Sequence, residues 1–326
     1  MIKLYIYRLF NLLSKSASNL EIQSSNLVEK SIIKEINYLA NYKSKLRRLL
    51  GYTIKNEKYK PKDISIKTKN SYAYVNVSAI HSFYYINDKH KIKSSEKLHF
   101  ILICKKVNRS WFVIDMCNKD IFPNVYKKLS ELKSFDKMDK PLDLEYRLKF
   151  FGEQLSSLNH FSIKFKKLLR TSKYPLSFRH NKYNAKLASK YAQKYALTYN
   201  SKYKNFDSSG GDCTNFISQC INAGNIPTNT KWKPYSNSWV RVNELYYYLI
   251  ENGLGVDVTS TNTYKEGDII QFYNKEKGYF SHSGIITHNL GHGEYLYCCH
   301  SYDKLNFPLS EVFPFMYDKI RVVQLL

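Results

Sequence analysis

The chain has few cysteines for its length, and their spacing excludes several kinds of protein. Six cysteines in 326 residues are too few for a disulfide scaffold, and no two of them form a C-x-x-C pair. Cys298 and Cys299 are adjacent, which suits neither an ordinary disulfide nor two ligands of a structural zinc site. We therefore expect reduced cysteines, no metal and no cofactor.

Long apolar runs are also missing. No stretch approaches the roughly 20 apolar residues that a membrane-spanning helix needs. The first 19 residues are partly apolar, but Arg8 and Asn11 interrupt them and no small-residue cleavage site clearly follows. An amphipathic helix is expected there rather than a signal peptide, which leaves the localisation open between the cytoplasm and export by another route.

Arginine is scarce, although the net charge is +24: only 9 of the 51 basic residues are arginine. Because arginine is the residue that reads phosphates and bases bidentately, specific nucleic-acid recognition is not expected. Residues 1–200 carry 40 basic and 15 acidic side chains, whereas residues 201–326 carry 11 and 12. This basic front part predicts attraction to a polyanion such as an anionic wall polymer, unless the lysines reflect a coding bias.

Apolar residues make up 43% of the chain and aromatic residues 15%, so the protein folds, and its length favours two domains. Apolar residues at helical spacing near the N-terminus give way to three β-branched and aromatic runs, at residues 72–86, 97–107 and 110–118. We expect residues 1–130 to form a cone-shaped α+β accessory domain, of the ketosteroid-isomerase or nuclear-transport-factor type. Residues 131–180 are expected to form a helical linker that packs between the domains.

Residues 181–326 are expected to begin with helices and to end with strands. In the first helix, residues 183–200, five side chains recur every fourth position and predict a buried aromatic stripe: Tyr183, Leu187, Tyr191, Tyr195 and Tyr199. A second helix follows from Cys213 to about Gly224, and a third covers 236–253. The later part predicts strands at 267–274, 281–288 and 294–300.

The stretch GGDCTNFISQC, residues 210–220, places a thiol where a helix begins. The free N–H groups and the positive end of the helix dipole at Cys213 would lower its pKa and favour the nucleophilic thiolate. Gly210 and Gly211 would allow a sharp turn and leave room for a substrate. The alternative is that Cys213 is simply a small buried apolar residue near a helix start.

A thiolate nucleophile needs a base, and the base needs a residue that orients it. If the last two strands form a hairpin with 288 opposite 294, His282 and His300 face each other directly. One imidazole could then act as base while the other holds its tautomer. A one-residue slip would turn His300 to the opposite face, and Asp303 is the rival third member.

Six blocks occur in an order that resembles a known family: YNAKLASKYAQKYALTYN, GGDCTNFISQCINAG, SNSWVRVNELYYYL, GDIIQF, HSGIITH and YLYCCHSYD. They resemble the bacterial putative amidase domain family, which is related to the papain-like CHAP and NlpC-type cell-wall hydrolases. The resemblance covers about residues 183–305 and implies a papain-like α+β fold for residues 181–326. It also implies that Cys213 is the nucleophile, His282 the general base and acid, and His300 the orienting residue. Asp212 and Thr214 would help to bind the free amine of a stem peptide.

The leading hypothesis is therefore a cysteine amidohydrolase that cleaves amide bonds, in peptidoglycan stem peptides, through a thioester acyl-enzyme. Trp232 and Tyr235 would line its cleft. One alternative is a non-catalytic wall-binding or interaction module on the same scaffold. Another is a zinc hydrolase that uses His282, His300 and either Cys298 or Cys299, although no acidic residue has the spacing of known zinc sites.

Overall fold

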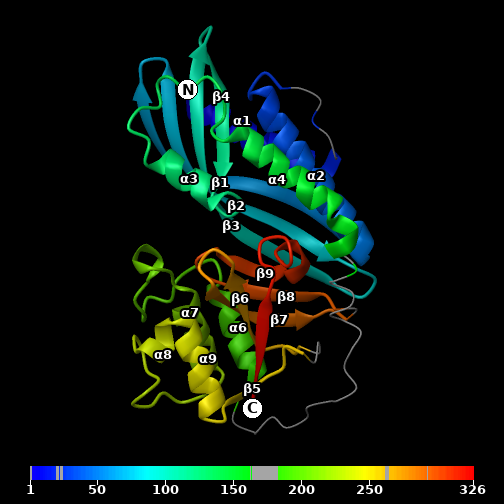
Figure 1. Ribbon diagram of the computed structural model, residues 1–326, viewed down its shortest axis with the longest axis vertical. Coiled ribbons are helices and arrows are strands. Elements are labelled where there is room, and N and C mark those ends of the chain that lie inside the picture. Colours follow the sequence, from blue (N-terminus) through cyan, green and yellow to red (C-terminus); the bar gives the residue numbers. More distant parts are fainter. Residues whose placement is uncertain are drawn as a thin grey trace. The chain divides into compact units, whose positions relative to one another are not determined.

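The computed structural model describes residues 2–19, 22, 25–161, 163, 183–260, 264–291 and 293–326. The chain forms two compact units, unit 1 from Met1 to Ser162 and unit 2 from Ile163 to Leu326 (Figure 1). Of the expected linker, residues 164–182 lie outside the described residues. Among the helices that are described, none combines the length and the apolar character needed to cross a membrane.

Over its described residues, unit 1 is an antiparallel meander with helices before it and after it. Its elements are α1 (Ile2–Asn19), α2 (Lys30–Leu50), β1 (Thr53–Lys69), β2 (Tyr72–Ile86), β3 (Lys91–Val107), β4 (Ser110–Asn118), α3 (Pro123–Ser130) and α4 (Leu144–Ser156). Strand β2 pairs with β1 and β3, and β3 also pairs with β4. This arrangement confirms the α+β class, while the likeness to the ketosteroid-isomerase type stays a prediction.

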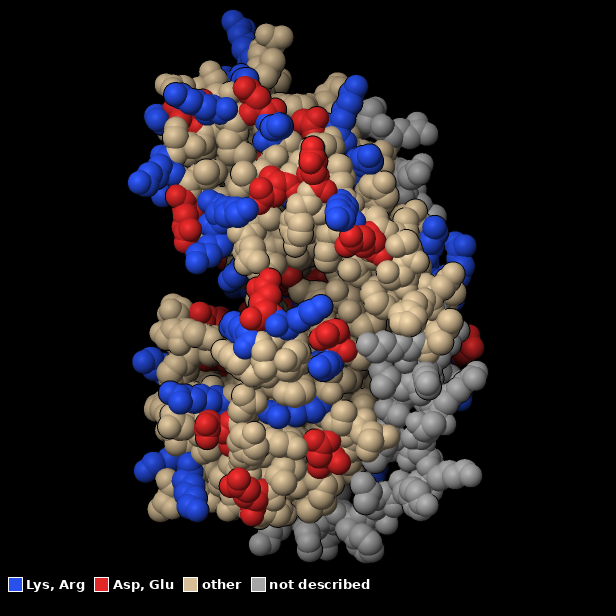
Figure 2. All heavy atoms as spheres, viewed as in Figure 1, with Lys and Arg blue, Asp and Glu red and all other residues tan. Residues whose placement is uncertain are grey.

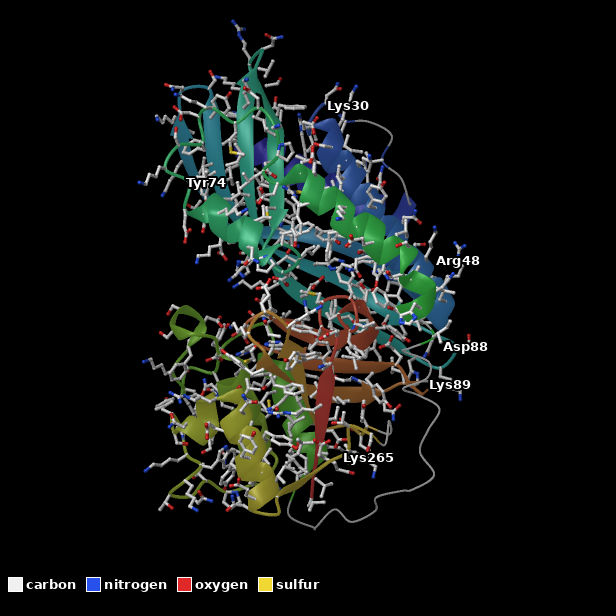
Figure 3. All side chains as sticks on the ribbon, in the orientation of Figure 1. Lys30, Arg48, Tyr74, Asp88, Lys89 and Lys265 are labelled. Atoms are coloured by element: carbon white, nitrogen blue, oxygen red, sulfur yellow. The ribbon has the colours of Figure 1, made fainter. Side chains whose placement is uncertain are left out.

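The meander of unit 1 buries side chains on both faces, because successive strand residues point to opposite sides. Alternate residues of β2 and β3, such as Val75 and Leu102, pack with α1 and α2 in one cluster. Their neighbours, including Tyr74 (Figure 3) and Ile103, pack with α3 and with Phe151 of α4 in another. Helix α4, which falls in the expected linker, therefore contributes to the core of unit 1.

Two buried charge clusters also belong to unit 1. The guanidinium of Arg147, in α4, donates to Asp115 of β4 at 2.6 Å and to Glu35 of α2 at 2.8 Å. The imidazole of His81, in β2, lies between the carboxylates of Glu57 and Glu96, at 2.7 and 2.8 Å. Arg147 and His81 are both fully buried, so each cation is balanced by carboxylates inside the fold.

Unit 2 combines helices with an antiparallel sheet. Its elements are α6 (Ala185–Tyr195), α7 (Cys213–Ala223), α8 (Asn237–Val240), α9 (Val242–Glu251), β5 (Gly255–Asp257), β6 (Ile269–Asn274), β7 (Tyr279–Asn289), β8 (Tyr295–Cys299), β9 (Lys304–Pro308) and β10 (Ile320–Leu325). The strands lie in the order β9-β8-β7-β6-β10-β5. Helices α6, α7 and α9 all contact β7 (Figure 1), so the central strand of the sheet meets the start of α7.

The buried side of α6 differs from the prediction. Ala188, Ala192 and the neighbouring Ala196 are completely buried, whereas Leu187 is exposed and Tyr191 and Tyr195 are half-buried. The alanine side of the helix, rather than the aromatic stripe, therefore forms the close contact. Small side chains allow two backbones to approach closely, and the larger tyrosines then cover the edge of that contact.

Candidate active site

Helix α7 packs in the core of unit 2, and its first turn carries Cys213. Every residue from 213 to 221 is buried, and Phe216, Ile217 and Ile221 belong to the apolar core of unit 2. Just before the helix, the φ angles of Gly210 and Gly211 are +106° and +111°. Side chains rarely tolerate these angles, so the glycines make the expected sharp turn that delivers the thiol to the helix start.

The Cys213 thiol is more buried than its sequence position suggests. Only 7% of the residue is exposed, and its sulfur lies 3.7 Å from the Thr214 hydroxyl. Burial raises the pKa of the thiol, although the Thr214 hydroxyl and the backbone amides of Ser283 and Thr214 act in the opposite direction. The expected lowering of the pKa by the helix start is therefore outweighed by desolvation.

Asp212 occupies the position before the helix but does not cap it. Its Oδ1 accepts from the Phe206 amide at 2.9 Å and from the side-chain amide of Asn215 at 2.9 Å, and its Oδ2 faces His300 at 2.7 Å. Asp212 is 1% exposed and its carboxylate has these three partners, so its role in binding a substrate amine stays a prediction. The first N–H groups of α7 receive no side-chain cap from it.

His282, in β7, is a buried histidine, and among the residues that the structure describes no carboxylate forms an ion pair with it. Its ring lies among the rings of Phe272, Tyr302 and Tyr317, with centroids 5.5 to 6.2 Å away. Burial, with a smaller contribution from the positive charge of Lys304, lowers the pKa of His282 to about 3. The imidazole is therefore neutral at physiological pH, and its burial makes it a weaker base than an exposed histidine.

The expected pairing of His282 with His300 is wrong by one residue. In the ladder, Ile285 pairs with Cys298 and Ile286 with Tyr297, which aligns position 300 with Ser283 rather than His282. Strand β8 ends at Cys299, so His300 follows it. A one-residue change of register moves a side chain to the other face of a sheet.

His300 instead joins the start of α7 to the end of α6. Its Nδ1 donates to Asp212 Oδ2 at 2.7 Å and its Nε2 donates to the Tyr195 carbonyl at 2.8 Å, while its ring stacks on Phe216 at 3.9 Å. Burial alone would lower the pKa of His300, but the hydrogen bond with Asp212 and the charge of Asp303 raise it. Both ring nitrogens face acceptors, so the imidazolium form suits this position.

The remaining candidate residues lie elsewhere or are enclosed. Asp303 Oδ1 accepts from the Ser301 amide at 3.1 Å, beside His300 rather than His282. Thr214 is completely buried against Ser283, at 3.4 Å between hydroxyl oxygens. Trp232 is completely buried and packs on Trp239 at 4.7 Å. Both side chains are enclosed in this structure, so the amine-binding role of Thr214 and the cleft-lining role of Trp232 stay predictions.

The residues of the zinc alternative are not brought together. The Cys298 sulfur accepts from the Asn306 amide at 3.3 Å and the Cys299 sulfur donates to the Tyr302 carbonyl, while His300 faces Asp212. Over the ranges that the structure describes, no three His, Cys, Asp or Glu side chains form a group suited to a metal ion.

Sequence reasoning missed how Ser283 and the backbone contribute to this region. The Ser283 amide lowers the pKa of the Cys213 thiol, and His282 is the residue directly before Ser283 in β7. The HS pair at 282–283 is part of the motif HSGIITH, which is the sequence signal for this serine. The Tyr195 carbonyl could not be found, because a backbone acceptor leaves no signal in a sequence.

Comparisons with known proteins find a family model within unit 2 and two relatives. Residues 182–325 match the family model described as "Putative amidase domain". The chain is 36% identical to the uncharacterized protein YjcM of Bacillus subtilis (strain 168) over 141 residues, which is 40% of this chain and 34% of that protein. It is 32% identical to the uncharacterized protein YhbB of the same strain over 113 residues, 31% of this chain and 35% of that protein.

The matched stretches thus span about a third of the length of each relative. No solved structure matches the chain. The amidase family model lies within unit 2, and residues 182–325 are therefore similar to a domain family named for amide hydrolysis.

Proposed function

We propose that unit 2 is a cysteine-dependent amidase of papain-like fold that cleaves amide bonds in peptidoglycan stem peptides. Cys213 is the nucleophile and His282 the general base and acid. The observation that carries the proposal is the position of the thiol at the uncapped start of α7, against the Ser283 amide that follows His282 in β7. The match of residues 182–325 to an amidase family supports the reaction type.

The protonation states suggest how the reaction begins. Because the pKa of Cys213 is raised and that of His282 is lowered, the resting pair is a neutral thiol and a neutral imidazole. His282 would take the thiol proton as the sulfur attacks the amide carbon, and would give it to the leaving nitrogen as the C–N bond breaks. A water molecule, deprotonated by His282, would then cleave the thioester to a carboxylic acid and restore the thiol.

The developing oxyanion needs hydrogen-bond donors that no other group has already taken. Asp212 directs its carboxylate to Phe206, Asn215 and His300 rather than to the helix start. The Cys213 backbone N–H is thereby a candidate donor for the oxyanion, with the positive end of the helix dipole behind it.

Digestion of purified peptidoglycan tests the proposal, with mass analysis of the fragments. The wild-type chain should release fragments with a new amine end, and Cys213→Ala should release none. Cys220→Ala is the matched control, because Cys220 is a completely buried thiol of the same helix, packed in the apolar core. Equal digestion by wild type and Cys213→Ala would contradict the proposal.

The second candidate is a non-catalytic module on the same scaffold, and the burial of the Cys213 and His282 side chains favours it. Cys213 is 7% exposed and His282 5%, so a substrate must displace neighbouring groups to reach them. Under this alternative the chain binds peptidoglycan but releases no new amine, and Cys213→Ala binds as well as the wild type does.

Unit 1 would hold the enzyme on an anionic wall polymer. Residues 1–162 carry 30 basic and 15 acidic side chains. Figure 2 shows lysine and arginine side chains spread over the visible face of unit 1, with acidic side chains between them. Sedimentation with wall fragments before and after extraction of their anionic polymer tests this, and salt-sensitive binding lost on extraction is the expected result.

A further inference from the structure

Two loops of unit 2 flank the start of α7, and each carries exposed lysines. The loop before α7 contains Lys202 and Lys204, and the loop before α8 contains Lys231 and Lys233; both loops can be followed in Figure 1. Within the described ranges none of the four forms an ion pair with an acidic side chain. Residues 183–326 carry 14 basic and 12 acidic side chains, so these four lysines, here called the lysine rim, are a local excess.

The two loops are joined to each other by Tyr235. The amide of Lys204 donates to the Tyr235 hydroxyl at 3.0 Å, and the rings of Phe206 and Tyr235 lie 5.7 Å apart. The Lys204 ammonium lies 5.0 Å from the centre of the Phe206 ring. Trp232, buried in the core, anchors the second loop, so the rim rests on a well-packed backbone.

Tyr235 combines exposure with an unfavourable backbone conformation. Its φ angle is +75°, in the left-handed region that large side chains avoid, and 48% of the residue is exposed. Strain of this kind persists only where the surroundings impose it, and it is often found at binding and catalytic sites. The exposed ring gives the lysine rim an apolar surface.

The lysine rim begins beside the nucleophile. The Asn215 side chain donates to the Lys204 carbonyl at 3.0 Å, and the Phe206 amide donates to Asp212 at 2.9 Å. Asp212 directly precedes Cys213, and Asn215 lies in the first turn of α7. A peptide that extends along this side of the thiol would therefore meet Lys204 and Tyr235.

We propose that the lysine rim and Tyr235 bind a carboxylate-bearing part of the peptide substrate, next to the amide that is cleaved. The ammonium groups pair with the carboxylate, and the tyrosine ring packs on the apolar part of the peptide. This inference rests on the proposed amidase function for the reaction, but the binding itself can be measured without turnover.

The test uses the full chain with Cys213→Ala and two synthetic peptides, L-Ala-γ-D-Glu-L-Lys-D-Ala and its isoglutamine form, which lacks one carboxylate. Calorimetry should show that the glutamate form binds several-fold more tightly and that added salt reduces the difference. Adding Lys204→Gln and Lys233→Gln should weaken binding of the glutamate form roughly threefold to tenfold and remove the preference.

The control adds Lys275→Gln and Lys277→Gln, which removes two exposed lysines from the β6–β7 turn and should leave the preference intact. Equal binding of the two peptides, or the same effect in both double variants, would overturn the inference. Binding of polyphosphate in place of the glutamate peptide would also overturn it. If the rim binds the peptide but the wild-type chain cleaves nothing, the amidase proposal fails and the binding site stands.

Discussion

The buried cations of unit 1 and the candidate catalytic pair of unit 2 have opposite surroundings. In unit 1, Arg147 lies between two carboxylates and so does His81, and each cation is neutralised where it is buried. In unit 2, Cys213 and His282 are buried with no ion pair among the described residues. Paired groups keep their charges inside the fold, whereas the unpaired thiol and imidazole have pKa values shifted toward their neutral forms.

The same contrast exists inside unit 2, between its two buried histidines. His300 has the Asp212 carboxylate at 2.7 Å, and its pKa is raised. His282 has aromatic rings around it, and its pKa is lowered to about 3. The two histidines thus differ in charge, with His300 favouring the charged form and His282 the neutral form, because a carboxylate lies beside His300.

The largest effect is expected when the unpaired imidazole is removed. His282→Ala should lower amidase activity about a thousandfold, because the thiol loses its base, and should also lower the unfolding temperature, because a buried ring is removed. Release of new amine from peptidoglycan measures the activity. His288→Ala, on the same strand, is the control and should keep full activity. A similar loss in both variants would mean that β7 is disturbed rather than its chemistry.

Replacing Arg147, whose charge is paired with two carboxylates, should instead destabilise the fold of unit 1. Arg147→Met leaves Asp115 and Glu35 buried without their partner, and burial already raises the pKa of Glu35 to about 7. We expect unit 1 to lose about 3 to 5 kcal/mol of stability. Hydrogen exchange read by mass spectrometry follows unit 1 separately. Lys149→Met, which removes an exposed pair with Glu153, should cost under about 1 kcal/mol, and an equal cost would refute the contrast.

His282 should make unit 2 sensitive to acid. Its folded pKa of about 3 lies below the unfolded value of about 6.5, so the unfolded chain binds the extra proton between these values. Its contribution to stability is complete above pH 6.5 and is lost toward pH 3, by up to about 1.4 kcal/mol per pH unit. His282→Gln should flatten this slope in urea unfolding; an unchanged slope would place the acid sensitivity elsewhere.

His300 should act in the opposite direction. Because its folded pKa is raised, its contribution to stability is complete below pH 6.5 and is lost as the pH rises through the folded value. His300→Gln should therefore remove a decline in stability on the alkaline side. The same urea series at pH 6 to 9 measures it, and a decline that persists in the variant would argue against a charged His300.

The smallest effect concerns the labelling rate of Cys213. Since burial raises the pKa of its thiol, alkylation by iodoacetamide should keep rising with pH beyond 8, roughly tenfold per pH unit. Cys104, whose pKa is raised to about 12 by burial, serves as the internal reference. A rate that levels off near pH 6 would instead support a thiolate stabilised by the helix start.

Much of this arrangement could be predicted from local patterns. The period-two runs at 72–86 and 97–107 correspond to β2 and β3, and the apolar spacing after Cys213 corresponds to α7. Gly210 and Gly211 have positive φ angles, and glycine adopts such angles more easily than any other residue. Such features depend on neighbours within a few positions, which a sequence displays directly.

The features that failed depend on residues far apart in the chain. The expected pairing of His282 with His300 required one particular register of β7 and β8, and a shift of one residue removes it. The register shifts between Ile286 and His288, where no turn-forming residue marks the position in the sequence. The pKa of Cys213 depended on how much water the surrounding core removes. The burial of Asp212, Thr214 and Trp232 has the same origin, since polar and aromatic residues occur both in clefts and in cores.

The sequence by itself determined that a thiol begins a helix and that an HS pair lies on a later strand, because both are local. Only the tertiary structure decided which histidine receives a carboxylate and which is left neutral. The reason is that charge inside a protein is set by the few groups within hydrogen-bonding distance, and strand register and core packing choose those groups.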